Sequence, residues 1–279
     1  MEPIDFQYSG VRHLLQCITN IQDDAVAVKG VTPEQFTQLR SEFEEKGRKF
    51  RLSLFLADIK LVIITIPTPY HEAMHARLGH RIYAKAIVMR LKNEFIPVAV
   101  STYDQRDAAG NITSSGESDS SYKPEPLRPT VHHYPTLIIQ SGYTQSWNSL
   151  RTKGRWWFEV SKHDVKIVLL VRLDEVRQEI TIERWKEVQH APQQLGQQIS
   201  AHTAVEPRCV QNITISRAPR IGFNNPNRFN PTSYQVVNAP LRLDFIDLML
   251  RPPIAPEADI ILGVADLQEF AAGVWRNYP

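Results

Sequence analysis

The chain has 279 residues with 42% hydrophobic and 22% charged side chains, which is the composition of a folded globular protein and excludes a disordered or coiled-coil chain. Its 32 basic and 30 acidic side chains give a formal net charge of +2, so no strong overall field directs it to nucleic acid or to an anionic surface. Two cysteines, Cys17 and Cys209, are too few for a disulfide framework or a four-cysteine zinc site.

The sequence also predicts no contact with a membrane. Its longest apolar run, around Leu61 to Ile66, is far shorter than the roughly 20 residues that span a bilayer. The start MEPIDFQYSG lacks a basic segment followed by an apolar one, so no secretory signal is expected. We therefore expect an intracellular protein, cytoplasmic or nuclear, with reduced cysteines.

In chain order, residues 1–47 have apolar groups at helical spacing and are predicted to be helical. The segments KFRLSLFLA and KLVIITIP follow as a predicted pair of buried strands. From His71 to Lys92 the apolar residues recur with a period close to 3.6, which predicts a long helix. A short strand is expected at Ile96 to Ser101, and the polar, glycine- and serine-containing segment after it is expected to be a loop or hairpin.

The centre of the chain has the clearest pattern. The strand PTLIIQSGY, a helix from about Gln145 to Glu159 and the strand VKIVLLVRL predict a βαβ crossover in a mixed sheet. QEITIERWK is expected to add a strand. A polar linker at 189–204, the segment CVQNITISR, an asparagine-rich stretch, LRLDFIDLML and a final amphipathic helix complete the chain.

One motif indicates zinc. In HEAMH, His71 and His75 are four residues apart on the predicted helix, so both can ligate zinc with Glu72 as general base. The extended signature of zinc peptidases needs a third histidine at position 81, which is Arg81, and His80 falls one residue short. In the alternative interpretation, His71 and Glu72 are ordinary first-turn residues of the helix.

Several segments, in order, resemble the PD-(D/E)XK superfamily of restriction-endonuclease-like proteins, and within it uncharacterised fungal members with a degenerate motif. The resemblance covers roughly Lys49 to Leu173. HE begins the long helix, ESDSSYKPEP is similar to the strand with the first metal-binding acid, and YPTLIIQSGYTQSWNSLRTKGRWWFEVSKHDVKIVLLV is similar to the second acid, crossover helix and last core strand. This resemblance implies a mixed central sheet flanked by helices.

The resemblance also implies a site. In the superfamily, two carboxylates bind Mg²⁺ or Mn²⁺ and a lysine assists attack on a phosphodiester. Asp119 matches the first acid, but Gln140 stands at the second acid position and Gly142 at the lysine position. Lys153 on the following helix is the candidate replacement, and Glu72 is a candidate metal ligand. Lys153 can instead be a lysine whose stem packs beside Trp157 while its ammonium reaches water.

A binding role has its own candidates. Arg151, Arg155 and Lys162 lie near a tryptophan pair, where cations could contact phosphates and exposed rings could stack on bases. In the alternative interpretation, Trp156 and Trp157 are core residues that hold the helix on the sheet. Arginines in the asparagine-rich stretch are a second candidate basic patch, for which a solvated loop is the favoured interpretation; its members are Arg217, Arg220 and Arg228.

The sequence thus predicts an α/β protein with an N-terminal helical cap (1–48), a nuclease-like core (49–186) and a C-terminal β-rich extension (187–279). The first functional hypothesis is a nuclease-like protein with a degenerate site, weak or inactive, that binds DNA, RNA or, through the cap, a protein partner. The second is an active Mg²⁺- or Mn²⁺-dependent nuclease using Asp119, Gln140 and Lys153. The third is a zinc peptidase built on His71 and His75.

Overall fold

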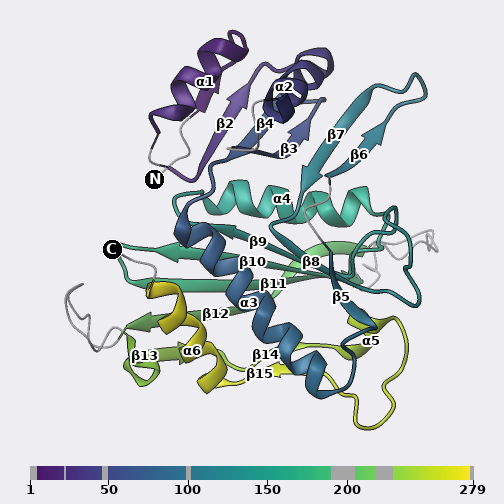
Figure 1. Cartoon of the computed structure of the whole chain (residues 1–279), viewed down its shortest axis with the longest axis vertical. Coiled ribbons are helices and arrows are strands. Elements are labelled where there is room, and N and C mark those ends of the chain that lie inside the picture. Colours follow the sequence, from purple (N-terminus) through teal and green to yellow (C-terminus); the bar gives the residue numbers. More distant parts are fainter. Residues whose placement is uncertain are drawn as a thin grey trace, which may run out of the picture.

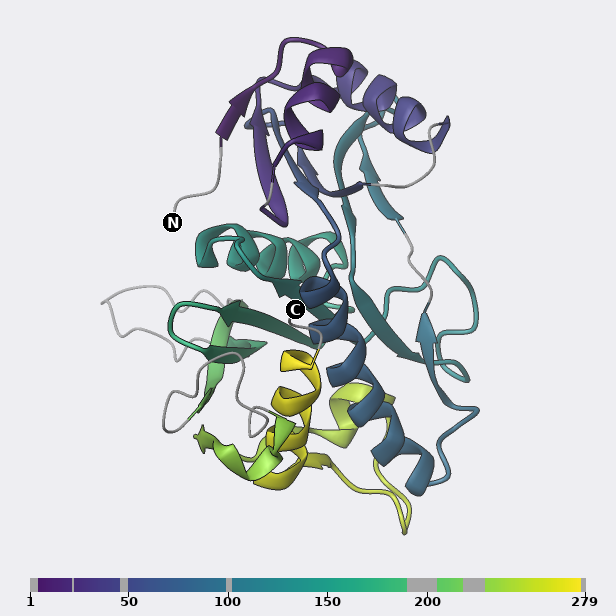
Figure 2. The same ribbon diagram turned by 60° about the vertical axis from the view of Figure 1, so that its left-hand side comes forward.

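The computed structural model describes residues 5–21, 23–45, 50–98, 102–189, 205–217 and 229–276, which form a mixed α/β structure in stacked layers. Figures 1 and 2 show a small sheet covered by two helices, a single helix beneath it, and a larger sheet with two helices on its far face. The single helix, α4 (Trp147–Val160), therefore lies between two sheets.

The smaller sheet has six strands and is built mainly from the N-terminal part of the chain. Helices α1 (Val11–Thr19) and α2 (Pro33–Glu45) cover its outer face. Its strand order is β1 (Asp5–Gln7), β2 (Ala25–Lys29), β4 (Leu61–Thr65), β3 (Arg51–Leu56), β7 (Ile112–Glu117) and β6 (Thr102–Arg106).

The prediction that residues 1–47 are helical throughout, and so form a helical cap, is wrong. Strands β1 and β2 lie in this segment, and β2 pairs with β4 in the register Ala27 to Ile63. The run AVAVK is too short for its periodicity to separate strand from helix, and pairing with a distant strand decides its state. The predicted strand pair β3 and β4 is confirmed, but both strands belong to this N-terminal sheet.

The larger sheet has seven strands and contains the predicted crossover. Strands β9 and β10 are parallel, with Gln140 opposite Leu170, and α4 connects them as the sequence predicts. The strand order is β13 (Tyr234–Val237), β12 (Val205–Arg217), β11 (Glu179–Gln189), β10 (Ile167–Asp174), β9 (Leu137–Gly142), β8 (Ser120–Pro124) and β5 (Phe95–Val98).

The C-terminal part of the chain extends this larger sheet. Strands β12 and β13 continue it beyond β11, while β14 (Leu241–Leu243) and β15 (Ile260–Leu262) form a separate two-stranded ribbon. Helix α6 (Val264–Trp275) packs beside α3 (Pro69–Val88), and the short α5 (Phe245–Met249) follows β14. The predicted linker beyond Gln189 and the asparagine-rich residues 218–228, with Arg220 and Arg228, lie outside the described residues.

Buried side chains form one core in each gap between layers. One core joins α1 and α2 to the six-stranded sheet. A second joins the opposite face of that sheet to α4 and the seven-stranded sheet, and includes Trp156 and Trp157. The third joins the seven-stranded sheet to α3 and α6. No helix among the described residues is long and apolar enough to cross a membrane.

Gly116 on β7 is where α4 approaches the six-stranded sheet most tightly. A Cβ atom at this position would lie 2.3 Å from the Trp156 ring. Because overpacking a filled core displaces side chains, Gly116→Ala should lower the free energy of unfolding by about 1–3 kcal/mol. Urea denaturation measures this, with Ser114→Ala on the same strand as a control expected to change it by less than about 0.5 kcal/mol. Equal effects of the two substitutions would contradict the predicted close packing.

Candidate functional site

Three elements, α3, β8 and β9, position the first group of predicted site residues. His71 and Glu72 lie in the first turn of α3, and Asp119 lies directly before β8. The pairing of Ser120 with Ile139 places Asp119 beside Gln140 on the neighbouring strand β9. The structure thus places the candidate residues of α3 next to those of the β8–β9 pair.

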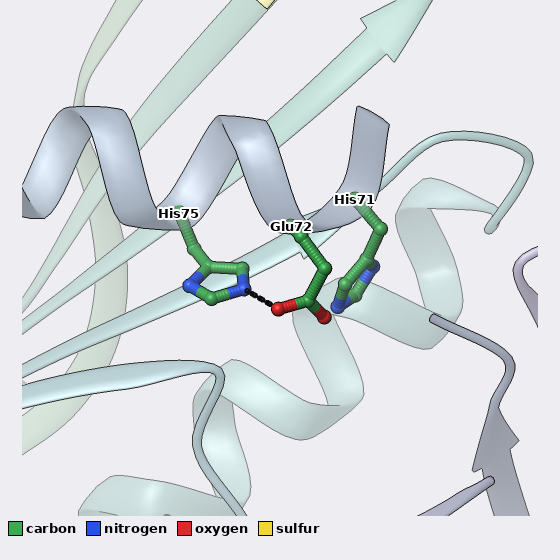
Figure 3. A group of neighbouring side chains, drawn as sticks. All are labelled: His71, Glu72 and His75. Carbon is green, nitrogen blue, oxygen red and sulfur yellow. Dashed lines mark hydrogen bonds and ion pairs between the residues drawn. The ribbon is translucent and has the colours of Figure 1, made fainter. Parts of the chain in front are cut away.

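The sequence explains why α3 begins where it does. Thr68 is the N-cap residue, its side chain accepts a hydrogen bond from the His71 N–H at 3.2 Å, and Pro69 occupies the first turn. From this start, His71, Glu72 and His75 point to the same side of the helix (Figure 3). His75 Nε2 lies 3.2 Å from Glu72 Oε2, and its Nδ1 lies 2.8 Å from Ser120 Oγ.

His71 is fully buried between two aspartates. Its Nδ1 lies 3.4 Å from Asp24 Oδ2 and its Nε2 lies 3.2 Å from Asp119 Oδ1. Burial alone lowers the pKa of His71, but the negative charges of Asp119 and Asp24 outweigh it and raise the pKa to about 9. The ring is therefore an imidazolium at neutral pH, with one carboxylate at each nitrogen.

Asp24, which sequence reasoning did not identify, anchors the turn that leads into α4. Its carboxylate accepts hydrogen bonds from the backbone N–H groups of Tyr143 (2.6 Å), Thr144 (2.8 Å) and Gln145 (3.0 Å), and from the Thr144 hydroxyl. Burial raises the pKa of Asp24, but the His71 charge and these hydrogen bonds produce a net lowering. Asp24 thereby links the six-stranded sheet to α3 and α4.

Asp119 has almost no contact with solvent, since 2% of its side chain is exposed. Its Oδ2 accepts a hydrogen bond from the Ser141 N–H at 2.7 Å, and its Oδ1 faces His71 and Arg51 Nη1, the latter at 3.6 Å. Burial raises the pKa of Asp119, but the positive charges of His71 and Lys153 hold it well below its usual value. Asp119 is therefore an ionised carboxylate inside a cluster of protein cations.

Arg51 is the second residue that sequence reasoning missed. It opens β3 in the six-stranded sheet, and its Nη2 donates to Glu72 Oε1 at 2.8 Å. Glu72 is the outermost acid of the cluster, with 40% of its side chain exposed. Burial raises the pKa of Glu72, while its hydrogen bond with His75 and the nearby positive charges lower it overall.

Gln140 and Gly142 lie on β9 in closely packed surroundings. Gln140 Nε2 donates to the Glu117 carbonyl oxygen at 3.0 Å, and its buried Oε1 has no hydrogen-bond partner among the described residues. At Gly142, a Cβ atom would lie 3.0 Å from both Gln145 Cβ and Leu150 Cδ1. A lysine at this position would collide with the start of α4.

Lys153 is buried, so the interpretation in which its ammonium reaches water is wrong. It is 1% exposed, and its Nζ has no hydrogen-bond partner among the described residues. Burial lowers the pKa of Lys153 more than the charges of Asp119 and Asp24 raise it. A helix that flanks a single sheet turns its opposite face to water. Here the six-stranded sheet covers that face of α4, which accounts for the burial of Lys153.

The basic and aromatic candidates for binding do not form one exposed surface on which bases could stack. Trp156 and Trp157 are 5% and 1% exposed, so they are core residues and do not offer faces to bases. Arg151 pairs with Glu183 at 2.5 Å, Arg155 lies over the Trp185 ring at 5.5 Å, and Lys162 is exposed after α4. Arg155 and Lys162 are the exposed cations among these candidates. The remaining arginine of the second basic patch, Arg217, is 4% exposed, so it is not part of a solvated loop.

The residues present do not fit a divalent cation well. Hard cations in proteins are bound by several oxygens that together carry negative charge. Here Asp119 is the only carboxylate of the core motif, one of its oxygens accepts the Ser141 N–H, and His71, Arg51 and Lys153 supply positive charge around it. Gln140 offers a neutral amide oxygen. These charged side chains pair with one another, as an ion network, instead of presenting several negatively charged oxygens to a cation.

The zinc alternative has a cluster of the right size. The ligand atoms of His71, Glu72 and His75 lie within 4.8 Å of one another. Zinc requires neutral imidazole nitrogens, however, and both nitrogens of His71 face carboxylates that favour the imidazolium. Glu72 is also bound to Arg51 and to His75 rather than free to act as general base.

The comparisons with known proteins find a likeness among solved structures. No family model matches the chain, and no curated protein matches it. The fold is similar to the crystal structure of a candidate nuclease belonging to DUF820 from Anabaena variabilis, with a TM-score of 0.39 and 12% identity over 87% of this chain and 99% of that chain. A TM-score of 0.39 is too low to assign the chain to that family.

Proposed function

We propose that this chain is a restriction-endonuclease-like protein in which the metal-dependent site has become an ion network, so that hydrolysis is weak or lost and the protein acts by binding. The observation that carries the proposal is the environment of Asp119, a buried carboxylate with His71 at 3.2 Å and Arg51 at 3.6 Å. A cation entering this site would meet the charges of His71 and Arg51 beside Asp119, and a neutral amide, Gln140, at the position where the superfamily has its second acid.

The arrangement of elements supports the nuclease-like part of the proposal. The superfamily pattern implied by the sequence has a helix, antiparallel strands that carry the acids, a crossover helix and a last strand parallel to its predecessor. Here α3 precedes β5, β8 and β9, which are antiparallel, and α4 leads to β10, which is parallel to β9. The six-stranded sheet and the β11–β13 extension are additional to this pattern.

The physical reason for weak hydrolysis is charge. Replacing a carboxylate by an amide at position 140 removes one negative charge from the metal's ligands, and the buried imidazolium of His71 adds a positive one next to the remaining acid. Both changes oppose the binding of a divalent cation. What remains is a rigid connection between the two sheets.

Incubation with Mn²⁺ tests this proposal, using supercoiled plasmid and single-stranded RNA as substrates. We expect the wild-type chain to cleave no more than Asp119→Ala, and Gln140→Glu to gain cleavage because it restores the missing carboxylate. The matched control is Gln105→Glu, since the Gln105 amide also donates to a backbone carbonyl, that of Val160 at 2.9 Å, but lies outside the site. Wild-type cleavage that Asp119→Ala abolishes would contradict the proposal.

That contrary result would favour an active Mg²⁺- or Mn²⁺-dependent nuclease. The specific observation in its favour is Lys153, a buried ammonium electrostatically coupled to Asp119, whose Nζ has no hydrogen-bond partner among the described residues. In such an enzyme Lys153 would stabilise negative charge on the scissile phosphate, in place of the lysine missing at position 142.

The binding partner is a further part of the proposal. DNA or RNA would meet Lys162, and Arg151 and Arg155 if their pairing with Glu183 and Trp185 were exchanged for phosphate. A protein partner would bind the N-terminal sheet and its two helices. A dedicated nuclease or DNA-binding protein more often has a basic excess, so the near-neutral net charge favours the degenerate site without favouring a nucleic-acid partner.

A further inference from the structure

Arg51 differs from Arg40, a partly buried arginine on the neighbouring helix α2, in where its charge is used. Arg40, on α2, is paired within the N-terminal layers: it binds Asp104 on β6 through both Nη atoms, at 2.9 and 2.8 Å, and Ser115 on β7. Arg51 instead reaches out of the sheet to Glu72 on α3, at 2.8 Å, and to Asp119 before β8. Its guanidinium thus faces two acids of another layer.

Those two acids are the ones that the superfamily resemblance marks as candidate metal ligands. Glu72 forms the solvent-facing side of the cluster and Asp119 the buried side, with 40% and 2% of their side chains exposed. The Arg51 side chain, 17% exposed, bridges them. Any cation that approached Asp119 from the Glu72 side would have to displace this guanidinium.

We infer that Arg51 is a built-in competitor for divalent cations: its guanidinium occupies the face shared by Glu72 and Asp119 and keeps the site closed. The inference rests on the proposed function, because it concerns the same site and explains why that site does not fit a metal ion. In this role Arg51, which belongs to the six-stranded sheet, lowers the metal affinity of the nuclease-like core.

Electrostatics gives the direction of the effect. A guanidinium a few ångströms from the position of a divalent ion repels it, and it also neutralises the carboxylates that would attract it. Without Arg51, the Glu72 and Asp119 carboxylates would have no guanidinium between them. Removal of the Arg51 charge should therefore expose a weak set of oxygen ligands to cations.

Direct measurement of Mn²⁺ binding tests the inference, by the electron paramagnetic resonance signal of free Mn²⁺ in titrations of the full chain. We expect Arg51→Gln to bind Mn²⁺ at least about tenfold more tightly than wild type. Arg40→Gln, which removes an arginine of comparable burial from the same part of the molecule, should bind like wild type. Arg51→Gln combined with Asp119→Asn should lose the gain.

Unchanged binding by Arg51→Gln would overturn the inference, and so would a gain that persists in the double variant. If Arg51→Gln does not fold, Arg51→Met keeps the packing of the stem and has the same expected result. Binding and cleavage separate the two claims. Wild-type cleavage would refute the proposed loss of hydrolysis, whereas the role of Arg51 depends only on the Mn²⁺ affinities.

Discussion

Asp24→Ala is expected to destabilise the protein by about 3–5 kcal/mol. The Asp24 carboxylate accepts three backbone N–H groups and one hydroxyl from residues 143–145, and it lies 3.4 Å from His71. Its removal leaves these donors and the buried imidazolium without their shared acceptor, and the cost of unpaired buried groups exceeds that of the lost hydrogen bonds alone.

The free energy of unfolding from urea denaturation measures this effect. Asp5→Ala is the matched control, because Asp5 also pairs with one cation, Lys29 at 2.5 Å, and both side chains are exposed, 45% and 58%. An exposed ion pair contributes at most about 1 kcal/mol. If the two substitutions cost the same, Asp24 does not hold the layers together as the structure indicates.

The elements that could be predicted from sequence are those whose signals are local. Helix α3 begins with Thr68 and Pro69, a cap and first-turn pair, and then keeps its apolar period for 20 residues. The crossover of β9, α4 and β10 has two strands with continuous apolar runs on either side of a capped helix. In both cases the neighbouring residues alone favour the observed state.

The layering could not be predicted in the same way. The strand pair β3 and β4 has clear strand character, but nothing in its residues says that it joins β2 and β7 rather than the core sheet. Its position over α4 is what buries Lys153 and Trp156. A lysine beside tryptophans is typical of a helix surface, so its burial follows only from a layer contributed by distant parts of the chain.

The site residues likewise divide into those that the sequence could identify and those that it could not. Asp119, Gln140 and Glu72 could be named because their order along the chain matches a known pattern. Asp24 and Arg51 could not, since they contact the site across long sequence separations, 119 residues from Asp24 to Tyr143 and 68 from Arg51 to Asp119. These two residues change the chemistry of the site, because one fixes His71 as a cation and the other covers the acids.

The stability of the protein should consequently fall as the pH rises from 6.5 to 9. The pKa of His71 is raised from 6.5 to about 9 in the folded state, so the folded state binds this proton more tightly than the unfolded chain does. The stabilisation is complete below pH 6.5 and is lost as the pH rises through 9, and it amounts to about 3 kcal/mol. Once the ring is neutral, Asp119 and Asp24 lose the charge between them, and their repulsion opposes folding.

Urea denaturation at a series of pH values between 6 and 10 measures this loss. His71→Gln should remove the pH dependence across this window, because a neutral side chain then stands between the two aspartates at every pH. His132→Gln replaces an exposed histidine and should leave the wild-type dependence unchanged. A wild-type free energy of unfolding that stays constant from pH 6.5 to 9 would show that His71 is not the buried cation of the site. The ion network would then lack the charge that opposes metal binding at Asp119.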